Sequence, residues 1–183
     1  MRGAGDHSDR PNMRHLLVLA TTMAVAAMLI GPSSASANND PHRIFLESAP
    51  FDLPVGYCTF PVHVDTLANR EYATFSTLPD GSTFIEVTGS FFVSLTNRDT
   101  GKTIVINASG PGSFTISPDD MTVIGDFRGR GLLWAPNLTE FGFPSNVVAA
   151  AGPMSITQVA ADGTFTSVSG HPHVITDVCA ALS

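Results

Sequence analysis

Apolar and polar residues alternate along most of the chain from residue 57 onward. In the longest alternating run, one face is apolar and contains Ile85, Val87, Phe91, Val93 and Leu95. Since successive side chains of a β-strand point to opposite faces, this period predicts strands with one buried face. Gly89 lies in the middle of the run, and we expect the strand to bend there because a glycine bends at the lowest cost.

Short turn sequences rich in Gly, Pro, Asn and Asp separate the predicted strands. They occupy residues 78–81, 97–101, 109–112, 118–120 and 161–163. Short strands joined by such turns, without a convincing amphipathic helix, are typical of an antiparallel all-β fold. The short connections favour a meander, in which each strand pairs with the next one along the chain. Residues 176–182 predict either a short helical turn or a last strand.

A sheet of this many strands must close or fold over to hide its edges. We predict a closed or nearly closed β-barrel of about 8–10 strands, because long bent strands suit a barrel. The alternative is a two-sheet β-sandwich. All 12 phenylalanines lie after residue 37, so the interior is either a Phe-rich packed core or an apolar cavity.

The first 37 residues have the pattern of a secretory signal peptide. Positively charged residues precede an uncharged stretch at residues 16–30, and the small residues Ala35-Ser36-Ala37 follow it. This stretch is too short for a permanent membrane span, so we predict cleavage after residue 37 and a secreted protein with no span left. The leader is long, and the true start is Met1 or Met13.

The mature chain divides into two parts. Residues 38–56 predict an irregular N-terminal arm, because Pro41, Pro50 and Pro54 interrupt regular structure. Residues 57–183 have the size of a single all-β domain. The formal net charge of the whole chain is -7, which excludes a typical nucleic-acid-binding protein. We expect a monomer.

Cys58 and Cys179 are the only cysteines of the chain. An even number of cysteines in an exported protein predicts a disulfide bond, because thiols are oxidised outside the cytoplasm. We therefore expect these two residues to be paired.

Five segments stand out beside Cys58 and the predicted strand that follows it, namely residues 88–97, 100–103, 108–112, 132–134 and 176–182. Together they resemble a family of small secreted actinobacterial proteins of unknown function. The resemblance covers most of residues 57–183. It implies a shared scaffold of turns, strand cores and cysteines, and it names no activity and no site.

The candidates for catalysis and metal binding are few. His63 and Asp65 lie on one face of a predicted strand, and Glu86 lies in the middle of another, so a small enzyme using these residues is one alternative. His171 and His173 are close in sequence, but no ligand spacing links them to other residues. The chain has no nucleophile elbow, zinc-helix motif or phosphate loop. We therefore predict no catalytic residue, metal or cofactor.

The favoured function is a secreted, non-catalytic binding module for a small apolar ligand. The loop at residues 136–146 could act as a lid. The proposed ligand-binding residues are Phe91, Val93, Trp134, Phe141 and Phe143. The alternative partner is a cell-envelope component, bound by an extracellular interaction protein with a packed core.

Overall fold

The computed structural model describes residues 43–183, so the predicted signal peptide lies outside the described residues. Within this part the chain is all-β, apart from the short 3-10 helix η2 (Leu138–Phe141) and the C-terminal helix α1 (Val178–Leu182). The predicted antiparallel all-β fold is confirmed. No helix in the described part is long and apolar enough to cross a membrane.

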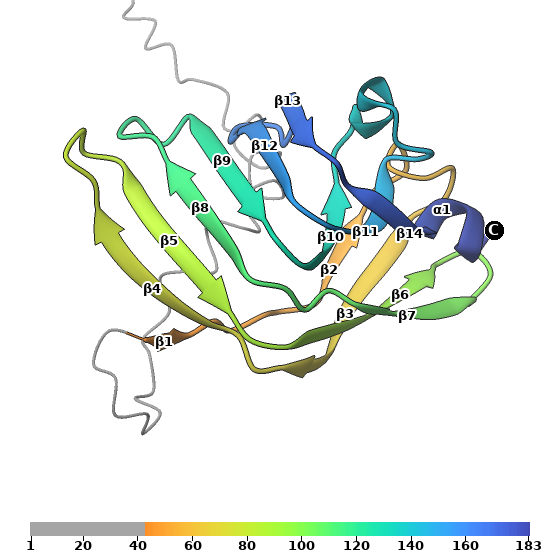
Figure 1. The fold of residues 1–183 in the computed structure, drawn as a ribbon. Helices are drawn as coiled ribbons and strands as arrows, with labels where there is room; N and C mark the ends of the chain where they lie inside the picture. Colours follow the sequence, from red (N-terminus) through yellow and green to blue (C-terminus); the bar gives the residue numbers. More distant parts are fainter. Residues whose placement is uncertain (1–42) are drawn as a thin grey trace, which may run out of the picture.

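Six long segments, each consisting of two strands with a bend between them, form the framework (Figure 1). They are β3 (Val62–Asn69) with β4 (Tyr72–Thr77), β5 (Thr83–Thr88) with β6 (Phe91–Asn97), β7 (Thr103–Asn107) with β8 (Gly112–Ile116), β9 (Thr122–Phe127) with β10 (Arg130–Trp134), β11 (Val147–Ala151) with β12 (Met154–Val159), and β13 (Phe165–Gly170) with β14 (His173–Asp177). Each segment pairs antiparallel with the next one along the chain, which is the order of a meander.

Glycines occupy the tightest points of the bends. Gly89 has a φ of 138°, and a Cβ atom there would overlap the carbonyl oxygen of Arg70 on the neighbouring segment. Gly110 and Gly129 also approach each other so closely that neither has room for a side chain. The bend predicted at Gly89 is confirmed, whereas the turn predicted at residues 109–112 is wrong. Those residues bend the chain from β7 into β8 without reversing it.

The strands on the two sides of the bends belong to different sheets. On one side is a seven-stranded sheet in the order β1-β4-β5-β8-β9-β12-β13. On the other side are a four-stranded sheet, β2-β3-β6-β7, and a three-stranded sheet, β10-β11-β14.

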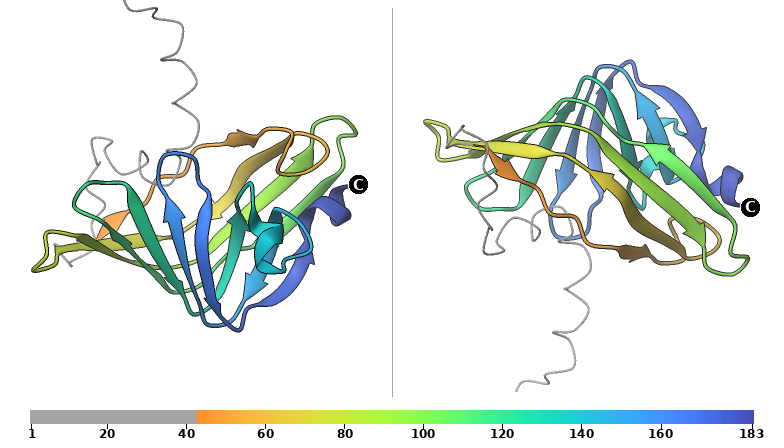
Figure 2. Two further views of the ribbon diagram at one scale, coloured as in Figure 1. Left: turned by 90° about the horizontal axis from the view of Figure 1, so that it is seen from above. Right: turned by 90° about the horizontal axis from the view of Figure 1, so that it is seen from below.

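None of these sheets closes on itself, so the predicted closed barrel is wrong. β8 and β9 pair, but β7 and β10, on the other side of the same bends, do not, and β13 at the edge of the seven-stranded sheet pairs only with β12. Figure 2 shows the sheets curving around a shared interior without joining into a closed cylinder. A sandwich-like arrangement, the alternative, fits the two smaller sheets, which pack against each other.

The N-terminal arm is more regular than the sequence indicated. Its described part contains β1 (Ile44–Phe45), which pairs with β4, and β2 (Phe51–Leu53), which pairs with β3. Pro50 and Pro54 flank β2 and do not interrupt it, so no ladder hydrogen bond is lost there.

A hydrophobic core lies between the two smaller sheets and helix α1. Its largest fully buried members are Val62, Val93, Leu95, Val147, Val178 and Leu182. The disulfide bond between Cys58 and Cys179 confirms the predicted pairing and joins the β2–β3 connection to α1. The bond therefore links the two smaller sheets, between which there is no strand pairing.

The loop between β10 and β11 covers the opposite face of the three-stranded sheet. Leu138 in η2 is fully buried, and Phe143 packs in a second cluster with Leu133, Val148 and Phe165. The three-stranded sheet is therefore apolar on both faces, one against the core and the other against this loop.

Candidate functional site: an apolar pocket at the strand bends

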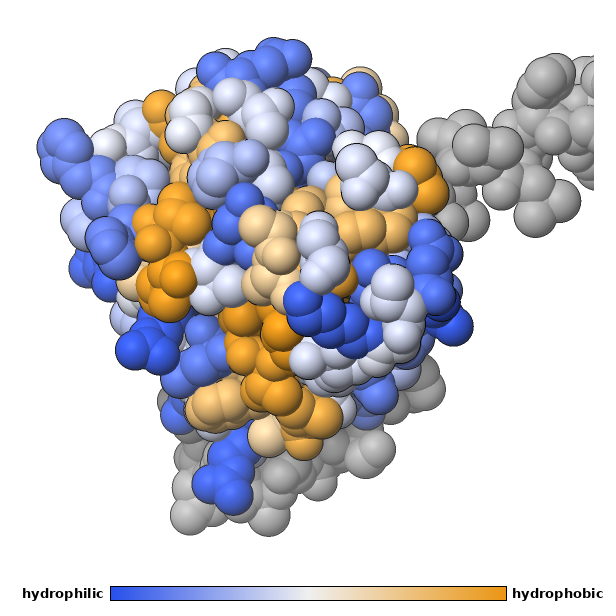
Figure 3. All heavy atoms as spheres, turned by 90° about the vertical axis from the view of Figure 1, so that its right-hand side faces the viewer, coloured by the Kyte–Doolittle hydropathy of each residue, from blue (hydrophilic) through white to orange (hydrophobic). Residues whose placement is uncertain are grey.

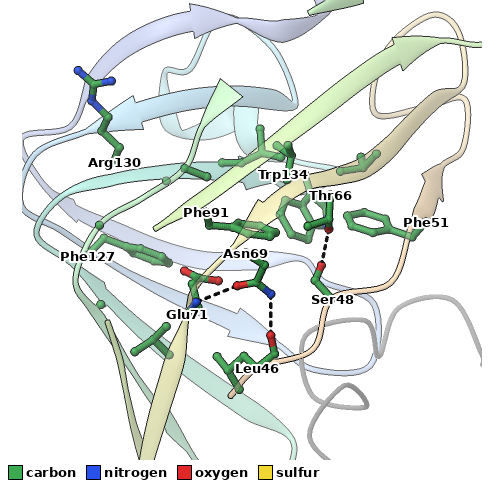
Figure 4. A pocket seen from close by; sticks show the side chains of 18 of the residues that line it. Leu46, Ser48, Phe51, Thr66, Asn69, Glu71, Phe91, Phe127, Arg130 and Trp134 are labelled. Carbon is green, nitrogen blue, oxygen red and sulfur yellow. Dashed lines mark hydrogen bonds between the residues drawn. The ribbon is translucent and has the colours of Figure 1, made fainter. Parts of the chain in front are cut away.

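A pocket of about 220 Å³ lies on the inner side of the bends (Figure 4). Residues of all three sheets line it, together with the β1–β2 and β7–β8 connections. Most lining side chains are apolar, and the largest are Phe51, Phe91, Phe114, Phe127, Leu132 and Trp134. Concave sites of this composition are typical of small-molecule binding.

Small residues at the bends leave the space that forms the pocket. Ala108, Gly110, Gly112 and Gly131 all belong to its lining and contribute almost no side-chain volume. A chain must use small residues where backbones approach closely, and the same residues cannot fill the interior beside them. The pocket is therefore a consequence of how sharply the strands bend.

Strand alternation determines which side chains reach the pocket. In β6, Phe91 and Val93 point inward, and in β10, Leu132 and Trp134 do. Leu133, between the last two, points to the opposite face and packs in the outer cluster.

Aromatic pairs hold the walls of the pocket in place. The rings of Phe51 and Trp134 have centroids 5.5 Å apart, and those of Phe114 and Phe127 lie 5.6 Å apart in an edge-to-face arrangement. Such pairs contribute about 0.5–1.5 kcal/mol beyond their buried area, which favours a preformed site.

Polar residues line one wall of the pocket, where the β1–β2 connection lies against β3. Asn69 donates a hydrogen bond of 2.6 Å to the carbonyl oxygen of Leu46, and its side-chain oxygen accepts one of 2.8 Å from the backbone N–H of Glu71. Thr66 donates a hydrogen bond of 3.0 Å to Ser48. These bonds fix the β1–β2 connection against β3 (Figure 4).

Glu71 is the unusual residue of this wall. Its carboxyl group is largely buried, and within residues 43–183 it forms no hydrogen bond or ion pair. Desolvation raises the pKa of Glu71 to about 7, because burial disfavours the charged form. The pocket therefore contains one acidic group whose charge no neighbour balances.

The structure brings together three of the five predicted ligand-binding residues. Phe91, Val93 and Trp134 line the pocket, whereas Phe141 and Phe143 do not. Both belong to the outer cluster, because the loop at residues 136–146 folds over the far face of β10 and β11. This loop cannot serve as a lid for the pocket.

The candidate catalytic residues do not converge. His63 Nδ1 lies 2.8 Å from Asp52 Oδ1, and Arg98 binds both oxygens of the same Asp52 carboxylate on the exterior. Asp65 accepts a hydrogen bond from the backbone of Thr66. Glu86 is exposed on β5, and none of these acidic or histidine side chains lines the pocket.

Among the described residues, the other two histidines are His171 and His173, which are exposed near the bend between β13 and β14. Within residues 43–183, no group of three or more His, Cys, Asp or Glu residues is arranged to hold a metal ion.

The exterior offers scattered apolar side chains. The most exposed large ones are Val55 (65%), Val105 (59%) and Leu67 (54%), which lie on different elements. On the face shown in Figure 3, hydrophobic residues form separate groups between hydrophilic ones. Single exposed apolar residues are normal on protein surfaces and do not by themselves mark an interface.

No protein-family model, curated protein or solved structure matches the chain significantly. The geometry of the pocket is therefore the basis for assigning a function.

Proposed function

We propose that this protein is a non-catalytic binding module that holds a compact apolar molecule in the pocket at the strand bends. The observation that carries the proposal is a 220 Å³ space with apolar walls contributed by all three sheets. Aromatic pairs and hydrogen bonds already fix the walls, so ordering the site on ligand binding has a smaller entropic cost.

The volume of the pocket limits the size of the ligand. A dry cavity of about 150 Å³ holds a benzene molecule. The pocket of 220 Å³ therefore suits a molecule with a single ring and a short side chain, or one end of a longer molecule that extends into solvent.

We infer that the protein works outside the cytoplasm. The disulfide bond between Cys58 and Cys179 and the predicted signal peptide support this inference. An extracellular binding protein of this kind would sequester or carry its ligand.

Trp134 provides the test, because it is the only tryptophan of the chain and it lines the pocket. The probe is 2-cyclohexylethanol, a neutral molecule that absorbs no light at the excitation wavelength. We expect a saturable change in emission with a Kd of about 0.1 mM, as nine non-hydrogen atoms at roughly 0.6 kcal/mol each would give.

A substitution that fills the pocket should weaken the binding of 2-cyclohexylethanol. In the variant Ala108→Phe a large ring replaces a methyl group of the lining, and we expect the affinity to fall at least tenfold. Val105→Phe is the matched control, because Val105 lies on the same segment and is 59% exposed. Val87→Phe fills the pocket from another strand and serves if Ala108→Phe does not fold. A wild-type protein without saturable binding, or a folded filled variant that binds normally, would contradict the proposal.

A further inference from the structure

Glu71 gives the pocket a chemical preference that its apolar walls do not explain. The backbone N–H of Glu71 donates a hydrogen bond to the side-chain oxygen of Asn69, and its carbonyl oxygen accepts one of 3.0 Å from the N–H of Leu46. These two bonds hold the backbone of Glu71 in the pocket wall. In Figure 4 the carboxyl group points into the space beside Phe127 and Asn69.

The other charged residues of the pocket do not balance Glu71. They are Glu47, on the β1–β2 connection, and Arg130, at the start of β10, and both are exposed. Figure 4 shows the Arg130 side chain directed away from Glu71. All lining residues contributed by β3, β5, β6, β8 and β9 are uncharged.

A positively charged ligand group would supply the missing partner. An ammonium group in the pocket would form a charge-assisted hydrogen bond with the carboxylate, which is about twice as strong as a neutral one. A ligand carboxylate would meet like charge at Glu71. The net charge of -7 for the whole chain further favours the approach of cations over anions.

We propose that the pocket prefers a compact apolar molecule carrying a basic nitrogen, which pairs with the Glu71 carboxylate. This inference rests on the proposed binding function and adds the chemical class of the ligand. Glu71 acts as a recognition residue and takes part in no covalent step.

The preference should depend on pH in a defined direction. Burial holds the pKa of Glu71 at about 7 in the free protein, so the ionised fraction rises about tenfold between pH 6 and pH 8. Only the ionised form pairs with an ammonium group, and a simple alkylamine stays protonated up to about pH 10. Amine affinity should therefore rise about tenfold over this range. At pH 6 binding should release close to one proton.

Three probes with one cyclohexyl body separate charge from shape. They are 2-cyclohexylethylamine, 2-cyclohexylethanol and 3-cyclohexylpropionate, each titrated at pH 8 with Trp134 emission as the signal. We expect the amine to bind about tenfold to a hundredfold more tightly than the alcohol, and the carboxylate more weakly than the alcohol.

Two variants locate the effect. Glu71→Gln keeps the side-chain shape and should remove both the amine preference and its pH dependence, while alcohol affinity stays within about twofold. Glu86→Gln removes an exposed carboxylate on β5 that does not line the pocket, and it should leave the preference intact. Circular dichroism confirms that each variant is folded.

The outcomes separate two proposals, the preference for a basic nitrogen and the binding of an apolar ligand in the pocket. If the alcohol binds but the amine shows no preference, or if Glu71→Gln keeps the preference, the inference is wrong and the apolar pocket stands. If none of the three probes binds, the proposed function fails as well.

Discussion

Gly89 is the residue at which the bent framework is most tightly constrained. Its φ of 138° is a conformation that other residues rarely adopt, and the backbone of Arg70 occupies the place of a Cβ atom. The sequence predicted this bend because the glycine interrupts an alternating run between two apolar halves. Such a local signal needs no knowledge of distant contacts.

Gly89→Ala should lower the free energy of unfolding by about 3 kcal/mol or more, since backbone strain and overlap with Arg70 add together. Gly101→Ala is the control, because Gly101 has a φ of 75° but open space around its Cα atom. That substitution should cost about 1 kcal/mol. Urea unfolding followed by circular dichroism measures both values. Equal losses would show that the close approach at Gly89 is not a constraint.

Glu71 illustrates what a residue pattern cannot predict. The strand pattern of the sequence singled out Glu86, which is exposed in the fold, and gave no sign that Glu71 is buried. Its burial depends on Leu46 and Phe127, which lie far away along the chain and meet it only in the folded protein. By contrast, strand alternation predicted that Phe91 and Val93 share one apolar face, and both of them line the pocket.

At the scale of elements, hairpin turns were predicted well and strand bends poorly. The turns at residues 78–81, 97–101, 118–120 and 161–163 all reverse the chain between paired strands. Residues 109–112 have similar turn composition, yet they join two strands of one continuous segment. Gly and Pro mark a change of direction, and the neighbouring backbone decides whether that change becomes a reversal.

The C-terminal segment combines the two structures predicted for residues 176–182, a last strand and a short helical turn, since β14 leads directly into α1.

The disulfide bond links the β2–β3 connection to helix α1, across a sequence separation of 121 residues. Replacing both cysteines, as in Cys58→Ser with Cys179→Ser, should lower the free energy of unfolding by about 2–5 kcal/mol, because a long loop is no longer closed in the unfolded chain. The β-type circular dichroism spectrum should persist, since neither cysteine lies in a strand of the three sheets.

A reductant provides the control for this prediction. It should lower the melting temperature of the wild-type protein to that of the double variant and leave the variant unchanged, because the described residues contain no other cysteine. A double variant as stable as the oxidised wild type would show that the bond contributes nothing.

At the scale of the whole molecule, the sequence determined the strand order but not the closure. Alternation sets which face of each strand is buried, and short turns set the meander. β8 and β9 pair, but β7 and β10 of the same two segments do not. This separation depends on contacts between distant parts of the chain, which no local pattern encodes. The apolar face of β5 and β6 therefore has two roles. Ile85 and Leu95 are buried in the core, Val87 and Phe91 line the pocket, and Val93 belongs to both.

A crystal structure of the protein under xenon pressure shows whether the pocket is open to an apolar ligand. Xenon enters apolar cavities without needing a specific chemical group. We expect a xenon atom between Val87, Phe91 and Trp134 in the wild-type protein and none there in Ala108→Phe. A wild-type crystal without xenon at this position, with the Trp134 ring filling the space, would show that there is no binding pocket.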